Sequence, residues 1–276
     1  MRKFSACVAV AAAAAVMGPS ALAAKMTKVG SHHMKIVRHT VRPGMKAHID
    51  ALLPGATSTC PPGQMGGSYC VGAPDPDAVF ETISINGIAS EPVTTNSGDT
   101  LLVAFVQSSG PKTGGQSSTV SGGGLTWHRA AAENQAGGDS EVWFAFLSGR
   151  LTRQTITATA ATKGFDENLT LVSFQNASGI GATGSFSSAS GAPTGTITTT
   201  QANSWVWASG NDFGGAALRR PGAGQTALVQ ALDLTSKKTY WTQTTNSPTA
   251  NAGTPVTIND TSPTGDPFNL VLVEIL

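Results

Sequence analysis

From Val79 to the end of the chain, short runs of Val, Ile, Thr, Phe and Trp alternate with turns of Gly, Ser, Asn, Asp and Pro. Runs of this kind are typical of β-strands, and no stretch between them has the 3.6-residue period of an amphipathic helix. Consecutive strands without intervening helices argue against parallel βαβ units and favour antiparallel sheets. We expect strands at residues 80–85, 100–107, 125–129, 141–147, 154–160, 169–174, 195–200, 204–209, 225–234, 238–244, 255–258 and 269–275.

Residues 80–276 are therefore predicted to form one all-β domain, an antiparallel β-sandwich of jelly-roll or immunoglobulin-like type. In such a domain two sheets stack face to face around a single interior. The last run, residues 269–275, is almost entirely apolar, which predicts a central strand covered on both faces. No self-similarity with a period of about 20 to 50 residues is visible, which argues against a solenoid or a propeller.

The chain begins with the layout of a secretory signal peptide, which we assign to residues 1–24. A basic start precedes an alanine-rich run at residues 6–17 and a small-residue cleavage site after Ala23 or Ala24. That run is shorter than the roughly 20 apolar residues of a membrane-spanning helix, and no later segment is long enough either. We expect a mature chain without a transmembrane segment, secreted to the extracellular space or the periplasm. The low share of charged residues, 12%, fits an extracellular β protein.

Residues 25–79 are predicted to be a mostly irregular basic arm followed by a linker rich in Gly and Pro. Between Lys25 and His48 there are six Lys or Arg residues, four histidines and no acid, whereas residues 49–276 hold nine basic and sixteen acidic residues. We favour a propeptide or solvated linker; the alternative is a tether for an acidic surface such as an anionic polysaccharide. The basic stretch has no aromatic residue for base stacking, so no specific nucleic-acid partner is expected.

Loss of the signal peptide removes Cys7 and leaves Cys60 and Cys70 as the cysteines of the mature chain. The residues between them are rich in Pro, Gly and Ser, and an oxidising compartment favours their closure into a disulfide. A metal site is not expected there, because no further thiol or imidazole follows at the usual spacing.

The β-prone region contains Gly-Leu-Thr-Trp at 124–127, Glu-Val-Trp-Phe-Ala at 141–145 and similar runs at 155–159 and 171–174. With these runs it resembles an uncharacterised β-sandwich module of secreted bacterial proteins. The resemblance covers residues 80–276 and implies an accessory or adhesive role, because such modules sit beside immunoglobulin-like or fibronectin-type domains. It supplies no functional residues. Further matching stretches lie at 179–184, 204–207, 210–212, 222–225, 257–261, 269–270 and 274.

Sequence signatures of catalysis are weak. The Gly-x-Ser-x-Gly elbow of α/β-hydrolases and the His-Glu-x-x-His motif of zinc hydrolases are absent. His128 is the one histidine within residues 80–276, and we expect a surface or hydrogen-bonded residue rather than a base. A glycosidase needs only two carboxylates at a set distance, so a secreted carbohydrate-active enzyme is the alternative function. The candidate carboxylates are Glu133, Asp139, Glu141, Asp166, Glu167 and Asp212.

No cofactor and no metal site is predicted. The histidines of the arm, His32, His33, His39 and His48, could ligate a transition metal, but adjacent histidines on an arm make a poor preformed site. The loops at residues 210–212 and 259–266 carry Asn and Asp oxygens of the kind that calcium uses. Ordinary turn chemistry is the favoured interpretation of these loops, and a weak structural calcium site is the alternative.

The tryptophans are the best remaining guide to a ligand. Trp205 and Trp207 alternate along one expected strand and so share a face. If exposed, they could stack on sugar rings together with Trp127, with Asp212 taking sugar hydroxyls; if buried, which we favour, they fill the space between sheets. The leading hypothesis is a secreted non-catalytic module that binds a glycan or surface polymer or serves adhesion. A structural role in an extracellular matrix or surface layer is a further alternative.

Overall fold

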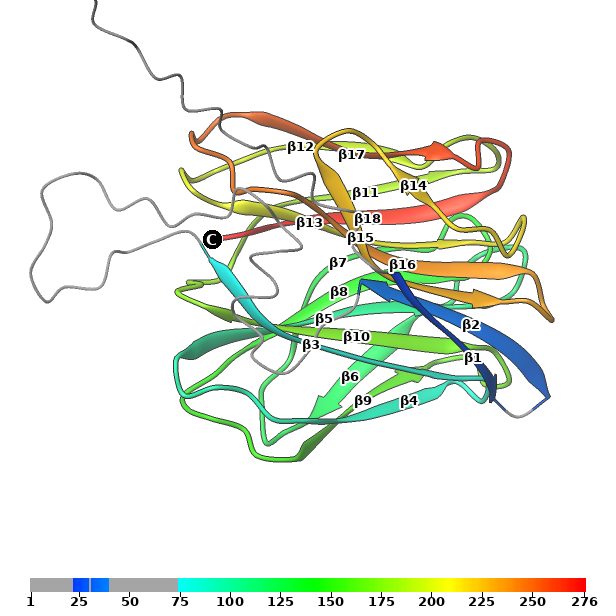
Figure 1. Cartoon of the computed structure of the whole chain (residues 1–276), viewed down its shortest axis with the longest axis horizontal. Helices are drawn as coiled ribbons and strands as arrows, with labels where there is room; N and C mark the ends of the chain where they lie inside the picture. Colours follow the sequence, from blue (N-terminus) through cyan, green and yellow to red (C-terminus); the bar gives the residue numbers. More distant parts are fainter. Residues whose placement is uncertain (1–21, 30, 40–73) are drawn as a thin grey trace, which may run out of the picture.

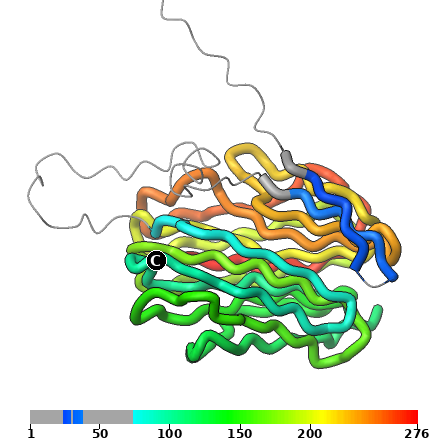
Figure 2. The backbone as a smooth tube through the Cα atoms, turned by 60° about the horizontal axis from the view of Figure 1, so that its bottom comes forward, coloured from blue at the N-terminus to red at the C-terminus, as the bar shows by residue number. Residues whose placement is uncertain are grey.

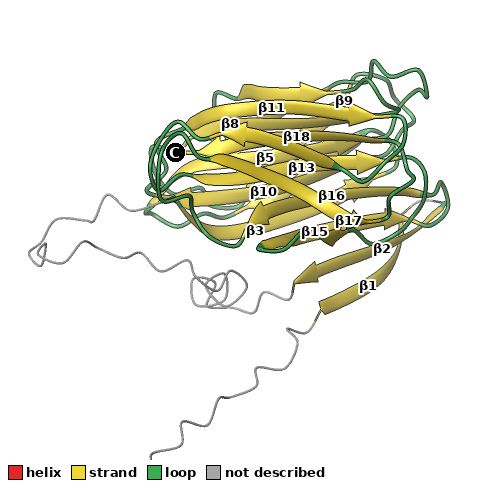
Figure 3. Ribbon diagram, turned by 90° about the horizontal axis from the view of Figure 1, so that it is seen from above, coloured by secondary structure: helices red, strands yellow, loops and turns green. Residues whose placement is uncertain are grey.

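The computed structural model describes residues 22–29, 31–39 and 74–276, and these contain strands and loops but no helix (Figure 3). Every strand pairing is antiparallel, as expected for an all-β sandwich. Most of the predicted signal peptide and both cysteines of the predicted disulfide, Cys60 and Cys70, lie outside the described residues.

Eighteen strands make up the described part of the chain, and each of the twelve expected runs overlaps one of them. The expected runs do not include the hairpin strands β1 and β2, nor the strands β4, β6, β11 and β14, which are short or rich in Gly and Ser. The bounds are β1 Leu22–Val29, β2 His32–His39, β3 Asp75–Ser84, β4 Ile88–Val93, β5 Asp99–Ser108, β6 Ser118–Gly122, β7 His128–Glu133, β8 Asp139–Phe146, β9 Gln154–Ala160, β10 Glu167–Gln175, β11 Ile180–Ser188, β12 Thr194–Thr198, β13 Trp205–Asp212, β14 Arg220–Pro221, β15 Gln225–Asp233, β16 Lys238–Thr245, β17 Pro255–Ser262 and β18 Phe268–Ile275.

The strands from β3 to β18 repeat one topology twice. In the first half, β3 to β10, a five-stranded sheet has the order β3-β10-β5-β8-β7 and a three-stranded sheet the order β4-β9-β6. In the second half, β11 to β18, the orders are β11-β18-β13-β16-β15 and β12-β17-β14, which are the same orders shifted by eight strands. The two halves are therefore structural duplicates, separated in Figure 2 into cyan-to-green and yellow-to-red segments.

A pair of buried amides marks equivalent positions in the two halves. In the first half Asn168 on β10 pairs with Gln107 on β5, and its Nδ2 donates to the Gln107 Oε1 at 2.6 Å. In the second half Asn269 on β18 pairs with Asn211 on β13, and its Nδ2 donates to the Asn211 Oδ1 at 3.1 Å. Each asparagine opens a similar run, Asn-Leu-Thr-Leu-Val at 168–172 and Asn-Leu-Val-Leu-Val at 269–273.

The four sheets form four layers, with the two small sheets outermost and the two large sheets in contact at the centre (Figure 1). Strand β5 shows how this works, because Val103 and Phe105 belong to the central apolar cluster while Ala104 and Val106 belong to the outer one. The expected pair of sheets around one interior is thus corrected to four sheets around three apolar layers. The cause lies in strands such as β5 and β18, whose side chains are apolar and buried on both faces and so need a covering sheet on each side.

The described part of the arm and linker is not irregular as expected, because β1 and β2 pair as a hairpin and β3 begins at Asp75, whereas residues 40–73 lie outside the described residues. Strand β2 pairs with β15 and so adds the hairpin to the edge of the second half's large sheet (Figure 2). Met34 on β2 is fully buried against Tyr240 and Ile83, and Ile36 packs beside it. Apolar residues at alternate positions of β2 therefore fasten the hairpin to the body.

Candidate functional site

The predicted ligand-binding tryptophans are in the core. Trp205 and Trp207 are 1% and 0% exposed, and the Trp207 ring stacks on Phe105 with 5.7 Å between ring centroids. The Trp205 Nε1 donates to the Thr245 carbonyl at 2.8 Å. Neither ring face is open to a sugar, so the packing interpretation replaces the binding one for this strand.

The other two predicted ligand residues are not brought to these tryptophans. Asp212 lies on the opposite face of β13, is fully buried, and forms an ion pair with the Arg219 guanidinium. Trp127 is half-buried against the outer apolar layer of the first half, and its Nε1 donates to the Gly122 carbonyl at 3.2 Å. The four residues Trp205, Trp207, Asp212 and Trp127 therefore form no common surface.

The two loops suggested for calcium do meet, but they enclose an arginine. Arg219 lies between Asp212 and Asp266, with its Nη2 3.9 Å from the Asp266 Oδ2, and its guanidinium covers the Trp241 ring at 4.8 Å. Burial lowers the pKa of Arg219 to about 10, against the attraction of nearby carboxylates. Burial raises the pKa of Asp260 to about 7 although Arg219 opposes the shift. The carboxylates of Asp212 and Asp266 are thus paired with the Arg219 guanidinium of the same chain.

Three of the six candidate carboxylates gather inside the first half. Asp139 and Glu141 on β8 and Glu167 on β10 are fully buried. Burial, and then the nearby Glu141 carboxylate, raise the pKa of Asp139 well above its ordinary value, and burial does the same for Glu167. Glu141 accepts from the Trp143 Nε1 at 2.6 Å and the Arg129 Nη1 at 3.2 Å. This cluster is closed from solvent, so it offers a sugar no access.

One aromatic group of the first half does reach solvent. His128 on β7 pairs with Phe144 on β8, with their ring centroids 5.5 Å apart, and Phe144 meets Phe146 edge to face at 5.8 Å. Phe146 is 54% exposed and His128 is exposed as well. The expectation of a surface position for His128 is therefore met. We call His128, Phe144 and Phe146 the aromatic edge.

The hairpin β1–β2 presents basic side chains to solvent. Lys25, Lys28 and His33 are exposed, and Met26 between the two lysines is 60% exposed. Lys28 and His33 are paired across the hairpin and share one of its faces, whereas Lys25, three residues from Lys28, lies on the other face.

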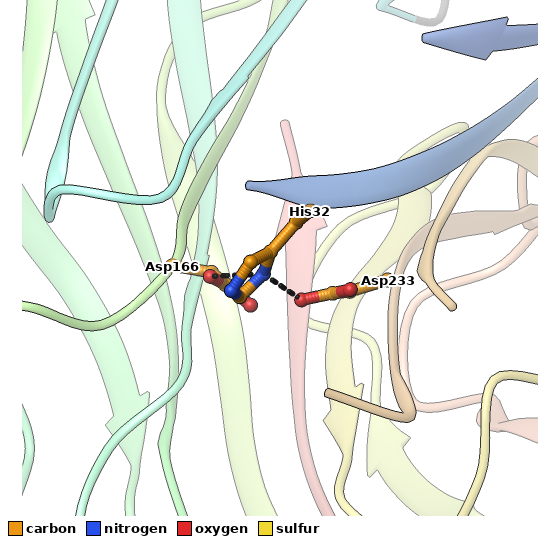
Figure 4. A group of neighbouring side chains, drawn as sticks. All are labelled: His32, Asp166 and Asp233. Atoms are coloured by element: carbon orange, nitrogen blue, oxygen red, sulfur yellow. Dashed lines mark hydrogen bonds and ion pairs between the residues drawn. The ribbon is translucent and has the colours of Figure 1, made fainter. Parts of the chain in front are cut away.

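His32, at the start of β2, points toward two carboxylates that sequence analysis did not associate with it (Figure 4). Its Nδ1 lies 2.5 Å from the Asp233 Oδ2 and 3.7 Å from the Asp166 Oδ1. Asp166 immediately precedes β10 in the first half, and Asp233 ends β15 in the second half. One ligand atom from each residue lies within 4.8 Å of the other two. The cluster thus joins the hairpin to both halves, and we call it the junction cluster.

Neighbouring donors hold the two carboxylates in place. The Asp166 Oδ2 accepts from the Tyr240 hydroxyl at 2.8 Å and lies 3.8 Å from the Lys238 Nζ. The Asp233 Oδ1 accepts from the backbone N–H of Thr235 at 2.8 Å and of Ser236 at 3.1 Å. The other oxygen of each carboxylate, Oδ1 of Asp166 and Oδ2 of Asp233, is the one nearest the imidazole.

Electrostatics differ between the two carboxylates of the junction cluster. Burial raises the pKa of Asp166, although Lys238 and the Tyr240 hydroxyl pull it back. Burial also acts against the charge of Asp233, but hydrogen bonds from Ser236 and Thr235 and from His32 lower its pKa below the ordinary value. Asp233 is therefore the more firmly ionised group.

One pattern in the sequence predicts that His32 faces the body, although it does not identify the two aspartates. His32, Met34 and Ile36 alternate, which places the imidazole on the face that packs against the body. The arm histidines predicted as a group are separated in the described part, because His33 points to solvent while His32 points inward. The side chain of His39 and all of His48 lie outside the described residues.

Comparisons with known proteins add no relative: the chain matches no protein-family model, no curated protein and no solved structure. Within the described residues there is no helix of the length and apolarity needed to cross a membrane. A shallow pocket of about 450 Å³ lies at the turn between β11 and β12, lined by Ser185, Phe186, Ser187, Ser188, Ser190, Gly191, Ala192, Thr194 and Phe268, and none of these side chains is charged.

Proposed function

We propose that this protein is a secreted, non-catalytic module that binds an anionic surface polymer, such as an acidic polysaccharide, through the hairpin β1–β2. The supporting observation is that Lys25, Lys28 and His33 are exposed on a hairpin packed against the body. Cations held on a paired hairpin lose less conformational freedom on binding than those of a flexible basic tail would.

Two further parts of the proposal concern export and fold type. The N-terminal residues have the layout of a signal peptide, and cleavage after Ala23 or Ala24 keeps Lys25 and nearly all of the hairpin in the mature chain. We assign each half to the jelly-roll type, because its eight antiparallel strands, numbered 1 to 8 along the chain, form two sheets in the orders 1-8-3-6-5 and 2-7-4.

The test is retention of the mature chain on a uronic-acid polymer compared with a neutral glucan. K25A/K28A is expected to weaken binding to the acidic polymer roughly ten- to thirty-fold at low salt, at about 1 kcal/mol for each lysine near an anionic surface. K112A/K163A removes the same charge from exposed loops of the body and serves as the matched control. Binding should also fall as salt screens the charges.

Each result has a definite meaning for the proposal. Equal losses in K25A/K28A and K112A/K163A would show a general charge effect and overturn the hairpin as the binding surface. Absence of binding to any polymer would favour the structural role instead. Release of sugar from either polymer would favour the two-carboxylate enzyme, which the buried acids of the first half do not support.

A second candidate function is binding of a neutral glycan at the aromatic edge. The observation in its favour is the exposure of Phe146, a large apolar ring held by Phe144 next to an exposed imidazole. Sugar rings stack on exposed aromatic faces, so F146A is expected to abolish retention on a neutral glycan and leave unfolding nearly unchanged. The matched control is I88A, which removes another exposed apolar side chain, 48% exposed, from β4. Equal retention by both variants would contradict this candidate.

A further inference from the structure

We propose that the junction cluster, His32 with Asp166 and Asp233, binds a divalent transition-metal ion of the zinc type, which fastens the hairpin to both halves of the molecule. The proposal goes beyond polymer binding and does not depend on it. It rests on the direction of the three donor atoms, on the way the carboxylates are held, and on the chemistry of the donor set.

The three donor atoms converge on one small volume. The His32 Nδ1, one oxygen of Asp166 and one oxygen of Asp233 lie within 4.8 Å of one another. Ligands about 2.0 to 2.2 Å from a zinc ion are separated from each other by distances no greater than this. The two aspartates are 2% and 0% exposed, while the His32 side chain is 23% exposed. The three side chains thus face one volume that is open to a water ligand on its outer side. The His32 Nδ1 and the Asp233 Oδ2, 2.5 Å apart without a metal, must separate to about 3.3 Å to ligate one tetrahedral ion.

The carboxylates are arranged as metal ligands are usually arranged. Each has one oxygen held by fixed donors, Tyr240 and Lys238 for Asp166 and two backbone N–H groups for Asp233. The second oxygen of each is directed at the imidazole, and that of Asp233, Oδ2, also accepts from the Ser236 hydroxyl. Outer hydrogen bonds of this kind orient metal ligands and account for a large part of metal affinity.

The donor set selects the class of ion. One imidazole nitrogen with two carboxylate oxygens suits zinc and its neighbours in the first transition series, whereas calcium and magnesium prefer oxygen ligands alone. A carboxylate oxygen can only accept, so the 2.5 Å contact with Asp233 places a proton on the His32 Nδ1 when no metal is bound. Metal binding displaces that proton from Nδ1, and the neutral ring then carries its one proton on Nε2 while Nδ1 forms the metal bond.

The experiment measures Zn²⁺ binding to the mature chain by titration calorimetry after treatment with EDTA. The expected result is one Zn²⁺ per chain and a melting temperature raised by roughly 5 °C at saturating Zn²⁺. H32A and D233N are expected to weaken binding by at least tenfold, in line with loss of a ligand. Co²⁺ in place of Zn²⁺ should give visible absorption bands that H32A loses.

The matched control keeps His32 and replaces the remaining histidines of the arm, H33A/H39A/H48A. It is expected to bind Zn²⁺ as tightly as the unchanged chain. If this variant loses Zn²⁺ and H32A retains it, a chelate formed by the other arm histidines is the site and the proposal is overturned.

One further variant is expected to bind Zn²⁺ more tightly, and a gain in affinity cannot be explained by misfolding. K238M removes the ammonium group 3.8 Å from Asp166, and less positive charge near the ion should tighten Zn²⁺ binding several-fold. A plain ion-pair junction would give no Zn²⁺ binding in any variant, and that result would also overturn the proposal.

Discussion

Single residues in the outer core of the first half carry carboxyl groups where the second half has apolar side chains. Glu141 and Glu167 occupy positions equivalent to Trp241 and Phe268, as judged from their pairing with β5 and β13. The sequence could predict that Asp139 and Glu141 share a face, because they are two residues apart on a strand. It could not predict their burial, because the covering sheet is formed by strands remote in the chain.

These buried acids make stability depend on pH. A raised pKa in the folded state means that the stabilisation is complete below the unfolded pKa, near 4, and is lost as the pH rises through the folded pKa of Asp139. D139N removes that loss, because an amide is neutral at every pH and can still donate to Glu141. D139N should therefore be more stable than the unchanged chain at pH 8, by roughly 1 to 3 kcal/mol, and similar to it at pH 4.

Urea unfolding at the two pH values checks this prediction, with E133Q as the control on a half-buried carboxylate. If D139N is less stable at pH 8 than the unchanged chain, the Asp139 charge is stabilising. The acidic cluster would then again be a candidate functional site.

Strand β18 shows what one element contributes. Its burial over its whole length confirms the predicted central position, and it lies between β13 and β11. Glu274 on β18 accepts from the backbone N–H of Ala182 on β11 at 2.8 Å and of Thr200 at 2.8 Å. Burial opposes its charge, but hydrogen bonds from Ser204, Ala182 and Thr200 lower its pKa. One carboxylate therefore ties two strands and a loop together.

Replacement of Glu274 should destabilise the sheet. E274A leaves several backbone donors without an acceptor, so we expect a loss of about 2 to 4 kcal/mol in the free energy of unfolding, and about half as much for E274Q. Since the folded pKa is lowered, this contribution is present above the unfolded pKa of about 4.3 and is lost as the pH falls through the folded value. Denaturant unfolding at pH 7 and pH 3 measures it, and equal losses at both pH values would contradict the assignment.

At the scale of the whole molecule, the duplication of strands β3 to β10 in strands β11 to β18 could not be predicted from the sequence. The expected strands were recognisable because apolar and β-branched residues alternate with turns, but the repeat survives mainly in one stretch, Asn-Leu-x-Leu-Val at 168–172 and 269–273. Different side chains fill equivalent positions: Leu101 and Val103 on β5 correspond to Trp205 and Trp207 on β13 in the same central layer. Strands that are apolar on both faces, such as β5 and β18, distinguish a stack of four layers from a sandwich of two, but the sheets that cover them are set by pairing between strands remote in the chain.

The central layer predicts that neither half is stable alone. Each half covers one face of its large sheet with its own small sheet but leaves the other face to its duplicate, and that face includes Trp205, Trp207 and Phe105. Fully burying a side chain of this size contributes roughly 1.5 to 3 kcal/mol, so an isolated half loses several such contributions and exposes an apolar patch prone to aggregation.

Residues 1–177 and 178–276, expressed separately, are therefore expected to be insoluble or molten, whereas co-expression should give a soluble complex that purifies together. Calorimetry of the intact chain should show one cooperative transition, since the halves share their central layer. Two separate transitions, or a fragment that unfolds cooperatively alone, would mean that each half is an independent domain and that the central contact is only a docking surface.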